Sequence, residues 1–312
     1  KYERRTMKEK RKLNKGGKIL LLFTLVVSSI FLLRPFTVKA DVNVNINKET
    51  QIVTDLIGQY NINYTGDANF FGFYGYYENN NYNEMVKDTD FKTTVDTIGK
   101  GKIVNSSIAS LKKTDGATQI EAAYLVWETS VQGKNNTDLV KKAANKAVYF
   151  AGSTDKGAFT KKVNASYAAV DMREPHLGTK EYTFSCMYTD VTATVQKYGY
   201  GKYGVANIPY VESTEKSNTS KGTHSGESSA AWQLIVIEKN SKANVRAVSL
   251  KVGSHFNYQQ ENSKWTRNPV TMNLDLGDCK TNQYINEDSE VSGELLLLGT
   301  NSGIVKSNAT EQ

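Results

Sequence analysis

The chain of 312 residues is long enough for one large all-β domain or two smaller ones. Its net charge of +7 and pI near 9.0 raise the question of whether it binds nucleic acid or a membrane surface. The charge is concentrated at one end, because residues 1–40 hold eleven Lys and Arg against two Glu, a net +9, which leaves −2 for the rest. The body of the protein therefore has no reason to attract phosphate, and we expect no nucleic-acid partner.

Residues 1–40 have the layout of a secretory signal peptide. A basic segment reaches Lys18, and the apolar stretch 19–33 that follows is shorter than the roughly 20 residues of a membrane-spanning helix. Val38 and Ala40 place small residues at the −3 and −1 positions of a cleavage site. We expect cleavage after Ala40, a secreted or cell-surface protein, and membrane contact only before cleavage; an uncleaved anchor is the alternative. The long basic segment is typical of exported proteins of Gram-positive bacteria.

The exported chain begins with a period-two run in residues 41–57, where Val42, Val44 and Ile46 alternate with polar residues and predict an edge strand. Residues 60–82 are dense in Tyr, Phe, Asn and Gly. This composition suits either a rigid contact surface or aromatic strands packed onto the domain, and we favour packing because exposed aromatic runs aggregate. If the segment is exposed, the predicted binding residues are Tyr74, Tyr76, Tyr77 and Tyr82.

From residue 102 onward the pattern repeatedly predicts β-strands separated by clusters of Gly, Asn, Ser, Thr and Lys. The predicted strands are 103–111, 120–131, 146–151, 159–170, 181–188, 203–211, 232–238, 245–252, 270–276 and 293–298. Two short helices are predicted at 137–146 and 191–198, the second capped by Asp190 and ended by Gly199. Residues 212–229 have a loop composition.

Residues 230–253 contain two apolar runs around a polar gap at 238–244, a pattern that predicts a β-hairpin. In the first run Leu234 and Val236 point to one face of the strand, and Ile235 and Ile237 point to the other. Because both pairs are apolar, this strand is expected to be buried on both faces. We predict an all-β fold, an antiparallel β-sandwich of jelly-roll or Ig-like type with one or two short helices, after a cleaved signal peptide. We expect residues 1–40 to be the signal peptide and residues 102–312 to form the β-sandwich. Residues 41–101 are expected to belong to the same domain as the sandwich.

The exported chain has two cysteines, Cys186 and Cys279. An even number of cysteines in an extracellular protein permits one disulfide. This bond would close a long loop and stabilise the folded state by about 4–5 kcal/mol. Two buried thiols that never meet are the equal alternative, because a large core needs no covalent link.

Six short blocks follow one another along the chain: AAYLVW at 122–127, AVYF at 147–150, DVT at 190–192, GKYGV at 201–205, AWQLIV at 231–236 and RAVSL at 246–250. Together they resemble the N-terminal β-sandwich region of large Gram-positive cell-surface proteins. The resemblance covers roughly residues 120–253 and implies extracellular, adhesin-like or structural work. Members of that family continue into stalk modules and a wall-sorting signal, and the sequence up to Gln312 holds neither, so we expect a fragment or a freely secreted form.

Catalytic motifs are weak. Residues 199–204 match G-x-G-x-x-G, but the match follows a predicted helix and enters a predicted strand, so the glycines are expected to shape a turn and not a dinucleotide site. His176, His224 and His255 have no metal-ligand spacing. A pairing of Cys186 with His255 has no local support, and we expect no enzymatic activity.

Carboxylates near turns permit a calcium site, although solvated turn acids are the favoured interpretation because no EF-hand loop is present. The candidate ligands are Asp171, Glu174, Asp275 and Asp278. An intramolecular Lys–Asn isopeptide bond is a further hypothesis, for which the sequence selects no triad. We expect no other cofactor.

The sequence therefore predicts an exported, non-enzymatic adhesion or structural module of a Gram-positive cell surface or cell wall. A host matrix protein or a surface glycan is the expected partner. The alternative is a carbohydrate-binding module, with calcium as an optional aid, and a glycosidase with two facing carboxylates is a third class.

Overall fold

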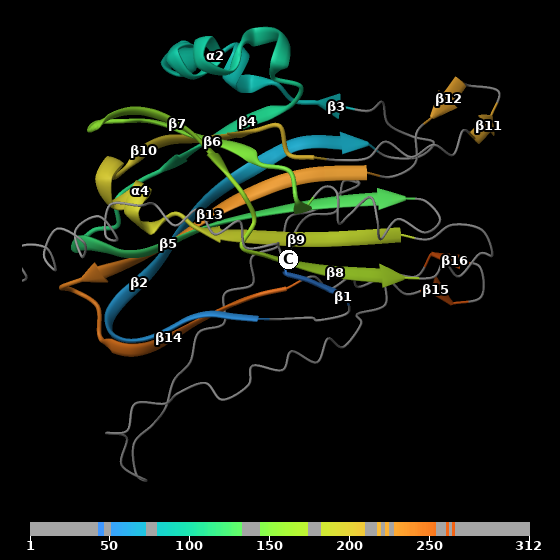
Figure 1. Ribbon diagram of the computed structural model, residues 1–312. Helices are drawn as coiled ribbons and strands as arrows, with labels where there is room; N and C mark the ends of the chain where they lie inside the picture. Colours follow the sequence, from blue (N-terminus) through green and yellow to red (C-terminus); the bar gives the residue numbers. More distant parts are fainter. Residues whose placement is uncertain are drawn as a thin grey trace, which may run out of the picture. The chain divides into compact units, whose positions relative to one another are not determined.

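The computed structural model describes residues 43–46, 51–72, 80–132, 144–173, 182–209, 217–219, 222–224, 228–253, 260–261 and 264–265 (Figure 1). The chain divides into two units between Ala40 and Asp41, and every described residue belongs to the second. The strands are β1 (Asn43–Ile46), β2 (Gln51–Gly72), β3 (Asn80–Asn81), β4 (Ser106–Leu111), β5 (Ala117–Gln132), β6 (Val148–Thr154), β7 (Gly157–Val163), β8 (Tyr167–Arg173), β9 (Tyr182–Asp190), β10 (Gly201–Ala206), β11 (Ser217–Thr219), β12 (Gly222–His224), β13 (Ser228–Asn240), β14 (Val245–Val252), β15 (Gln260–Glu261) and β16 (Lys264–Trp265). The helices are η1 (Glu84–Val86), η2 (Thr89–Phe91), α2 (Lys92–Ile98), η3 (Lys100–Lys102) and α4 (Thr192–Tyr198).

Two sheets face one another, and this confirms the predicted antiparallel all-β sandwich. The main sheet has the order β1-β8-β9-β5-β13-β2-β14, with β3 beside β2, and the second sheet has the order β4-β10-β6-β7. Every strand pair of these sheets is antiparallel except β1 with β8. β1 lies at the edge, as its sequence predicts. The predicted strand 159–170 is in fact two strands, β7 and β8, which belong to different sheets.

The hairpin predicted at residues 230–253 is wrong, because β13 and β14 each pair with β2 and not with one another. β13 pairs with the second half of β2 up to the Lys239–Tyr60 pair, and β14 continues along the first half from the Val245–Gln59 pair. The polar gap between them therefore leaves the β2 ladder as a loop instead of reversing the chain. A strand from much earlier in the sequence takes the place that the hairpin partner was expected to occupy.

β13 is buried on both faces, as predicted, because different elements cover its two sides. Trp232, Leu234 and Val236 lie in a core cluster with β4, β6 and β10 of the second sheet. On the other face, Ile237 contacts Val248 of β14 in a separate cluster. The apolar side chains from Trp232 to Ile237 are all at most 4% exposed, on both faces of the strand.

A helical cap of residues 84–102, made of η1, η2, α2 and η3, covers the outer face of the second sheet. Its side chains Met85, Phe91 and Ile98 form a cluster with Ala151 of β6 and Ala206 of β10. This cap is not among the elements predicted from the sequence. The spacing of Phe91, Val95 and Ile98 is helical, but a helix of seven residues shows too few turns for the period to stand out.

Helix α4 was predicted, and the structure contains it at Thr192–Tyr198. The N-cap residue is Val191, which makes no side-chain capping bond, so the prediction of Asp190 as the N-cap is wrong by one residue. Asp190 Oδ1 instead accepts from the Thr192 N–H at 2.7 Å, one residue before the N-cap. Gly199 ends the helix, as predicted. The helix predicted at 137–146 lies mostly outside the described residues.

An ion-pair triad connects the helical cap to β10. Lys202 Nζ lies 3.0 Å from Asp88 Oδ2 and 2.8 Å from Asp90 Oδ2. Burial raises the pKa of Asp88, but the hydrogen bonds from Lys202 and from the Asp90 N–H outweigh this, and the net pKa is below the usual value. The resulting stabilisation is present above the unfolded-state pKa near 4 and is lost as the pH falls through the lower folded-state pKa.

Acid is therefore expected to weaken docking of the helical cap. Between pH 5 and pH 2.5 the wild type should lose about 0.5–1 kcal/mol more unfolding free energy than Lys202→Met, because the pair is partly exposed. Urea unfolding at the two pH values measures the difference. Lys242→Met is the matched control, since Lys242 pairs with Asp115 at 2.7 Å on the exposed surface. Equal acid sensitivity of the wild type and Lys202→Met would contradict the expectation.

A buried polar network joins the two sheets. Asn69 of β2 donates through Nδ2 to Asn105 Oδ1 and to the Val205 carbonyl, each at 2.9 Å. Its Oδ1 accepts from Ser107 Oγ at 2.6 Å, and Ser107 Oγ accepts from Trp232 Nε1 at 2.8 Å. Asn69, Asn105, Ser107 and Trp232 are all 0% exposed. Because each of these polar groups has a partner, the network favours one relative placement of the sheets.

Candidate binding surfaces

Most long connections of the main sheet begin or end at the same edge of the sheet, where the ends of several strands lie side by side. Ser228 of β13 pairs with Gly72 of β2 and with Val131 of β5, Val131 pairs with Thr183 of β9, and Thr183 pairs with Met172 of β8. These five residues form a row across the sheet, at the right of Figure 1. We call this row and the connections that leave it the loop end.

The connections at the loop end lie largely outside the described residues. The strand residues next to which they begin or end are described, and these residues form the row. Residues 73–79 follow β2, 133–143 follow β5, 174–181 join β8 to β9, and 210–227 precede β13. The 73–79 connection carries three of the four predicted binding residues, Tyr74, Tyr76 and Tyr77. Strands separated widely in sequence thus bring four connections to one edge, as in sandwich domains that bind through clustered loops.

Tyr82 is the predicted binding residue that the structure describes. Its side chain is 40% exposed. Its N–H donates to the Asn69 carbonyl at 3.0 Å, and its carbonyl accepts from the Ser106 N–H at 2.8 Å. The backbone of Tyr82 is therefore held between β2 and β4, beside the loop end, with its ring available to solvent.

The first half of the aromatic segment 60–82 is described, and there the prediction that aromatic residues pack onto the domain is confirmed. Residues 60–72 are the inner part of β2, and Tyr60 and Phe70 are 7% and 2% exposed. Tyr64, in the same strand, is 50% exposed and lies opposite Ile235. The second half contains the three tyrosines that are outside the described residues.

The predicted calcium ligands are not brought together by anything the structure describes. Asp171 is in β8 opposite Phe184. Glu174, Asp275 and Asp278 fall outside the described residues. Within the described part of the chain, no group of three or more His, Cys, Asp and Glu side chains could hold a metal ion.

Cys186 is a buried free thiol, 3% exposed, in the cluster beneath β14. Burial, followed by the nearby Glu128 carboxylate, raises its pKa well above the usual value, so this thiol is a poor nucleophile. Cys279 lies outside the described residues, so its pairing with Cys186 stays a prediction. Of the three histidines, only His224 is described, in β12 opposite Ser217, and His176 and His255 are not.

The glycine motif at 199–204 shapes a turn, as expected, between α4 and β10. Gly199 ends the helix with φ +72°, and Gly201 has φ +145°. No strand precedes the motif directly and no helix follows it directly, so the arrangement differs from that of a dinucleotide-binding turn.

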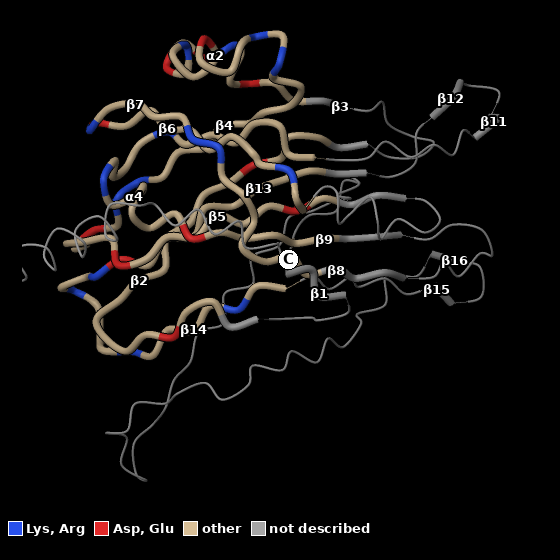
Figure 2. Tube along the Cα trace, viewed as in Figure 1, with Lys and Arg blue, Asp and Glu red and all other residues tan. Residues whose placement is uncertain are grey.

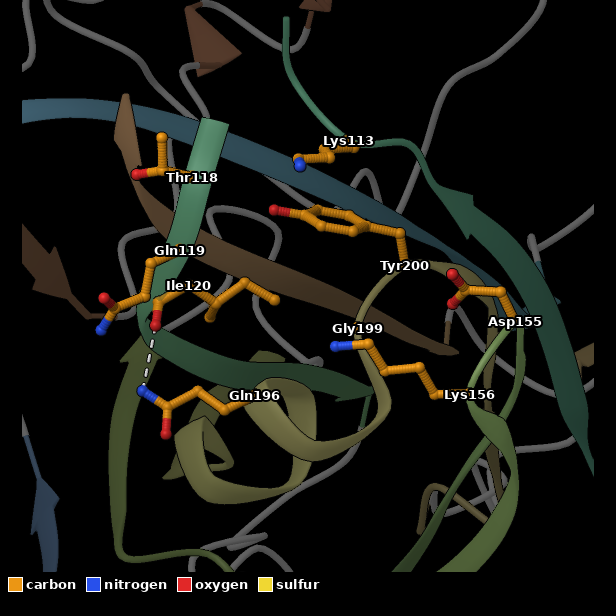
Figure 3. Close-up of a pocket in the computed structure, with 9 residues that line it drawn as sticks. All are labelled: Lys113, Thr118, Gln119, Ile120, Asp155, Lys156, Gln196, Gly199 and Tyr200. Atoms are coloured by element: carbon orange, nitrogen blue, oxygen red, sulfur yellow. Dashed lines mark hydrogen bonds between the residues drawn. The ribbon is translucent and has the colours of Figure 1, made fainter. Parts of the chain in front are cut away.

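The same turn forms one wall of a pocket of about 450 Å³, which we call the turn pocket (Figure 3). Its walls come from three turns at the end of the sandwich opposite the loop end, and from the start of β5 and the end of α4. The lining residues are Lys113, Thr118, Gln119, Ile120, Asp155, Lys156, Gln196, Gly199 and Tyr200. Figure 2 shows basic residues along the chain around α4. The pocket was not predicted from the sequence, since no local pattern relates these segments.

A buried carboxylate lies behind Tyr200. Glu238 of β13 is 0% exposed, and its Oε1 accepts from Asn63 Nδ2 at 3.1 Å. Burial raises the pKa of Tyr200, and the neighbouring Glu238 raises it further. The phenol therefore stays protonated at neutral pH and can serve as a hydrogen-bond donor.

Among the described residues there is no helix of the length and apolar character that crossing a membrane requires. Comparison with known proteins found no match to a family model, to a curated protein or to a solved structure.

Proposed function

We propose that the protein is an exported, non-enzymatic adhesion or structural module of a Gram-positive cell surface, which binds a host matrix protein or a surface glycan at its loop end. The row of residues from Gly72 to Met172 carries this proposal, because it brings the tyrosine-rich connection together with three others. The helical cap, the second sheet and the main sheet, whose edge strand β14 packs against β5 and β13, supply a scaffold beneath them.

Tyrosine suits this task because its ring provides a large, rigid contact area at low entropic cost, while its hydroxyl adapts to polar partners. A few aromatic residues near the centre of an interface commonly carry most of its binding energy. The resemblance of the sequence to Gram-positive surface proteins supports the same class of partner. The positive charge of residues 1–40 belongs to the proposed signal peptide and adds nothing to this recognition.

Removal of the loop-end rings is expected to abolish binding. The triple variant Tyr74→Ala, Tyr77→Ala, Tyr82→Ala should weaken binding to its matrix protein or glycan by at least about tenfold, as for interface hot spots. Surface plasmon resonance against immobilised matrix proteins and a glycan array measures the loss. Tyr64→Ala is the matched control, because Tyr64 is an exposed tyrosine in the middle of β2, away from the loop end. Unchanged binding by the triple variant, or an equal loss in Tyr64→Ala, would refute the assignment.

A further inference from the structure

The turn pocket has features of a binding site that the loop end does not supply. It lies at the opposite end of β13, whose ladder runs from the Ser228–Gly72 pair to the Lys239–Tyr60 pair, so the two surfaces are separated by roughly 35 Å of strand. Lys113 comes from the β4–β5 connection, Lys156 from the β6–β7 turn and Tyr200 from the α4–β10 turn. Three separate turns thus converge on one cavity.

Tyr200 provides an aromatic wall. Its hydroxyl oxygen is buried beside the Glu238 carboxylate, and among the described residues neither that oxygen nor Glu238 Oε2 has a hydrogen-bond partner. Asn63 holds the carboxylate from the other side, and Asn63 Nδ2 also donates to the Lys112 carbonyl at 2.6 Å. The hydroxyl end of the Tyr200 side chain is thus buried next to Glu238, while the ring lines the pocket (Figure 3).

Two lysine ammonium groups from different turns line the pocket. Figure 3 shows the nitrogen of Lys113 near the Tyr200 hydroxyl and that of Lys156 extended past Gly199 toward the pocket. Gly199 leaves room for this path, since a Cβ there would lie 3.3 Å from Lys156 Cε and 3.4 Å from Nζ. No salt bridge to a described residue neutralises either lysine. Asp155 is the single acid among the nine lining residues, so the lining side chains have a net positive charge, with the Glu238 carboxylate buried behind Tyr200.

The remaining lining groups are neutral and polar. Gln196 Nε2 donates to the Ile120 carbonyl at 3.0 Å, which fixes its side-chain amide at the pocket wall. Gln119 and Thr118 add a second amide and a hydroxyl from the start of β5. An aromatic ring with amides and hydroxyls around it suits a ligand that has an apolar face and many hydroxyl groups, and the volume is in the range of small-molecule sites.

We propose that the turn pocket binds an acidic saccharide, with a pyranose ring stacked on Tyr200 and its acidic groups paired with Lys113 and Lys156. A bare inorganic anion would leave the aromatic wall and the amides unused. A neutral sugar would leave both ammonium groups without a partner. The acidic saccharide is the class that uses both features of the pocket, and its binding does not depend on adhesion at the loop end.

Calorimetric titration of the full chain at low salt tests this site with uronate trimers of galacturonate, glucuronate and mannuronate. The neutral trimers of galactose, glucose and mannose are the matched ligands. At least one uronate trimer should bind at least tenfold more tightly than its neutral counterpart, and added salt should reduce the difference. The double variant Lys113→Gln, Lys156→Gln should remove it.

Lys162→Gln is the control for non-specific charge, because Lys162 lies over the Tyr149 ring at 5.3 Å on β7, outside the pocket. It should bind uronate as the wild type does. Circular dichroism checks that the lysine variants are folded, as expected for exposed side chains. The proposal is overturned if no uronate trimer binds, if neutral and acidic trimers bind alike, or if the double variant retains the preference.

Discussion

Replacement of Asn69 by alanine is expected to lower the free energy of unfolding by about 3–5 kcal/mol, the largest effect we predict for a single polar side chain. The change removes two donated hydrogen bonds and one accepted bond at a site with no solvent access. Ser107 loses its acceptor and the Val205 carbonyl loses a donor, and each unsatisfied buried group costs about 1–3 kcal/mol. Urea unfolding, followed by tryptophan fluorescence, measures the loss as a lower midpoint at an unchanged slope.

The matched control is Asn164→Ala, an exposed asparagine after β7, which should change stability by no more than about 0.5 kcal/mol. A double-mutant cycle of Asn69→Ala with Ser107→Ala separates the network from the volume change. Because the Ser107 hydroxyl joins Asn69 to Trp232, the two substitutions should be non-additive by at least about 0.5 kcal/mol. Additive effects, or a loss no larger than that of Asn164→Ala, would show that the sheets are not held by this network.

Gly201→Ala is expected to destabilise the protein by about 3–5 kcal/mol, for two reasons that add. The φ of Gly201 is +145°, which L-residues rarely adopt. In addition, a Cβ would lie 2.7 Å from Thr154 Cα and 2.8 Å from the Ser153 carbonyl oxygen, both backbone atoms of β6. Since backbone cannot move aside cheaply within a paired sheet, β6 and β10 would have to separate locally.

Two other glycines distinguish these causes. Gly157 has φ +117° and no atom within 4 Å of the place a Cβ would occupy, so Gly157→Ala should cost about 1–2 kcal/mol from backbone strain alone. Gly101 has open space and no positive φ, and Gly101→Ala should be nearly neutral. Thermal unfolding should rank the three in this order. Hydrogen exchange should show faster opening of β6 and β10 in Gly201→Ala alone, and equal losses at Gly201 and Gly157 would contradict the steric cause.

Of the two candidate sites, the sequence predicted residues of the loop end but not the turn pocket. The tyrosine-rich connection is visible as composition, and its tyrosines Tyr74, Tyr76 and Tyr77 were predicted as binding residues on that ground. The turn pocket was not predictable, because Tyr200 and Glu238 are far apart along the chain and neither belongs to a recognisable motif. The glycine motif beside it matches a dinucleotide pattern literally, but the predicted helix before it and strand after it already indicated a turn, and the structure has this turn between α4 and β10.

The sequence by itself determined the β-class of the fold, the double-sided burial of β13, helix α4 with its end at Gly199, and the edge position of β1. These features follow from local periodicity and capping, which act over a few residues. Only the tertiary structure decided that β2 pairs with both β13 and β14, that residues 159–170 divide between two sheets, and that three turns enclose the turn pocket. Strand pairing selects partners by shape and burial across the whole chain, so two adjacent apolar runs do not reveal whether a distant strand pairs with both of them.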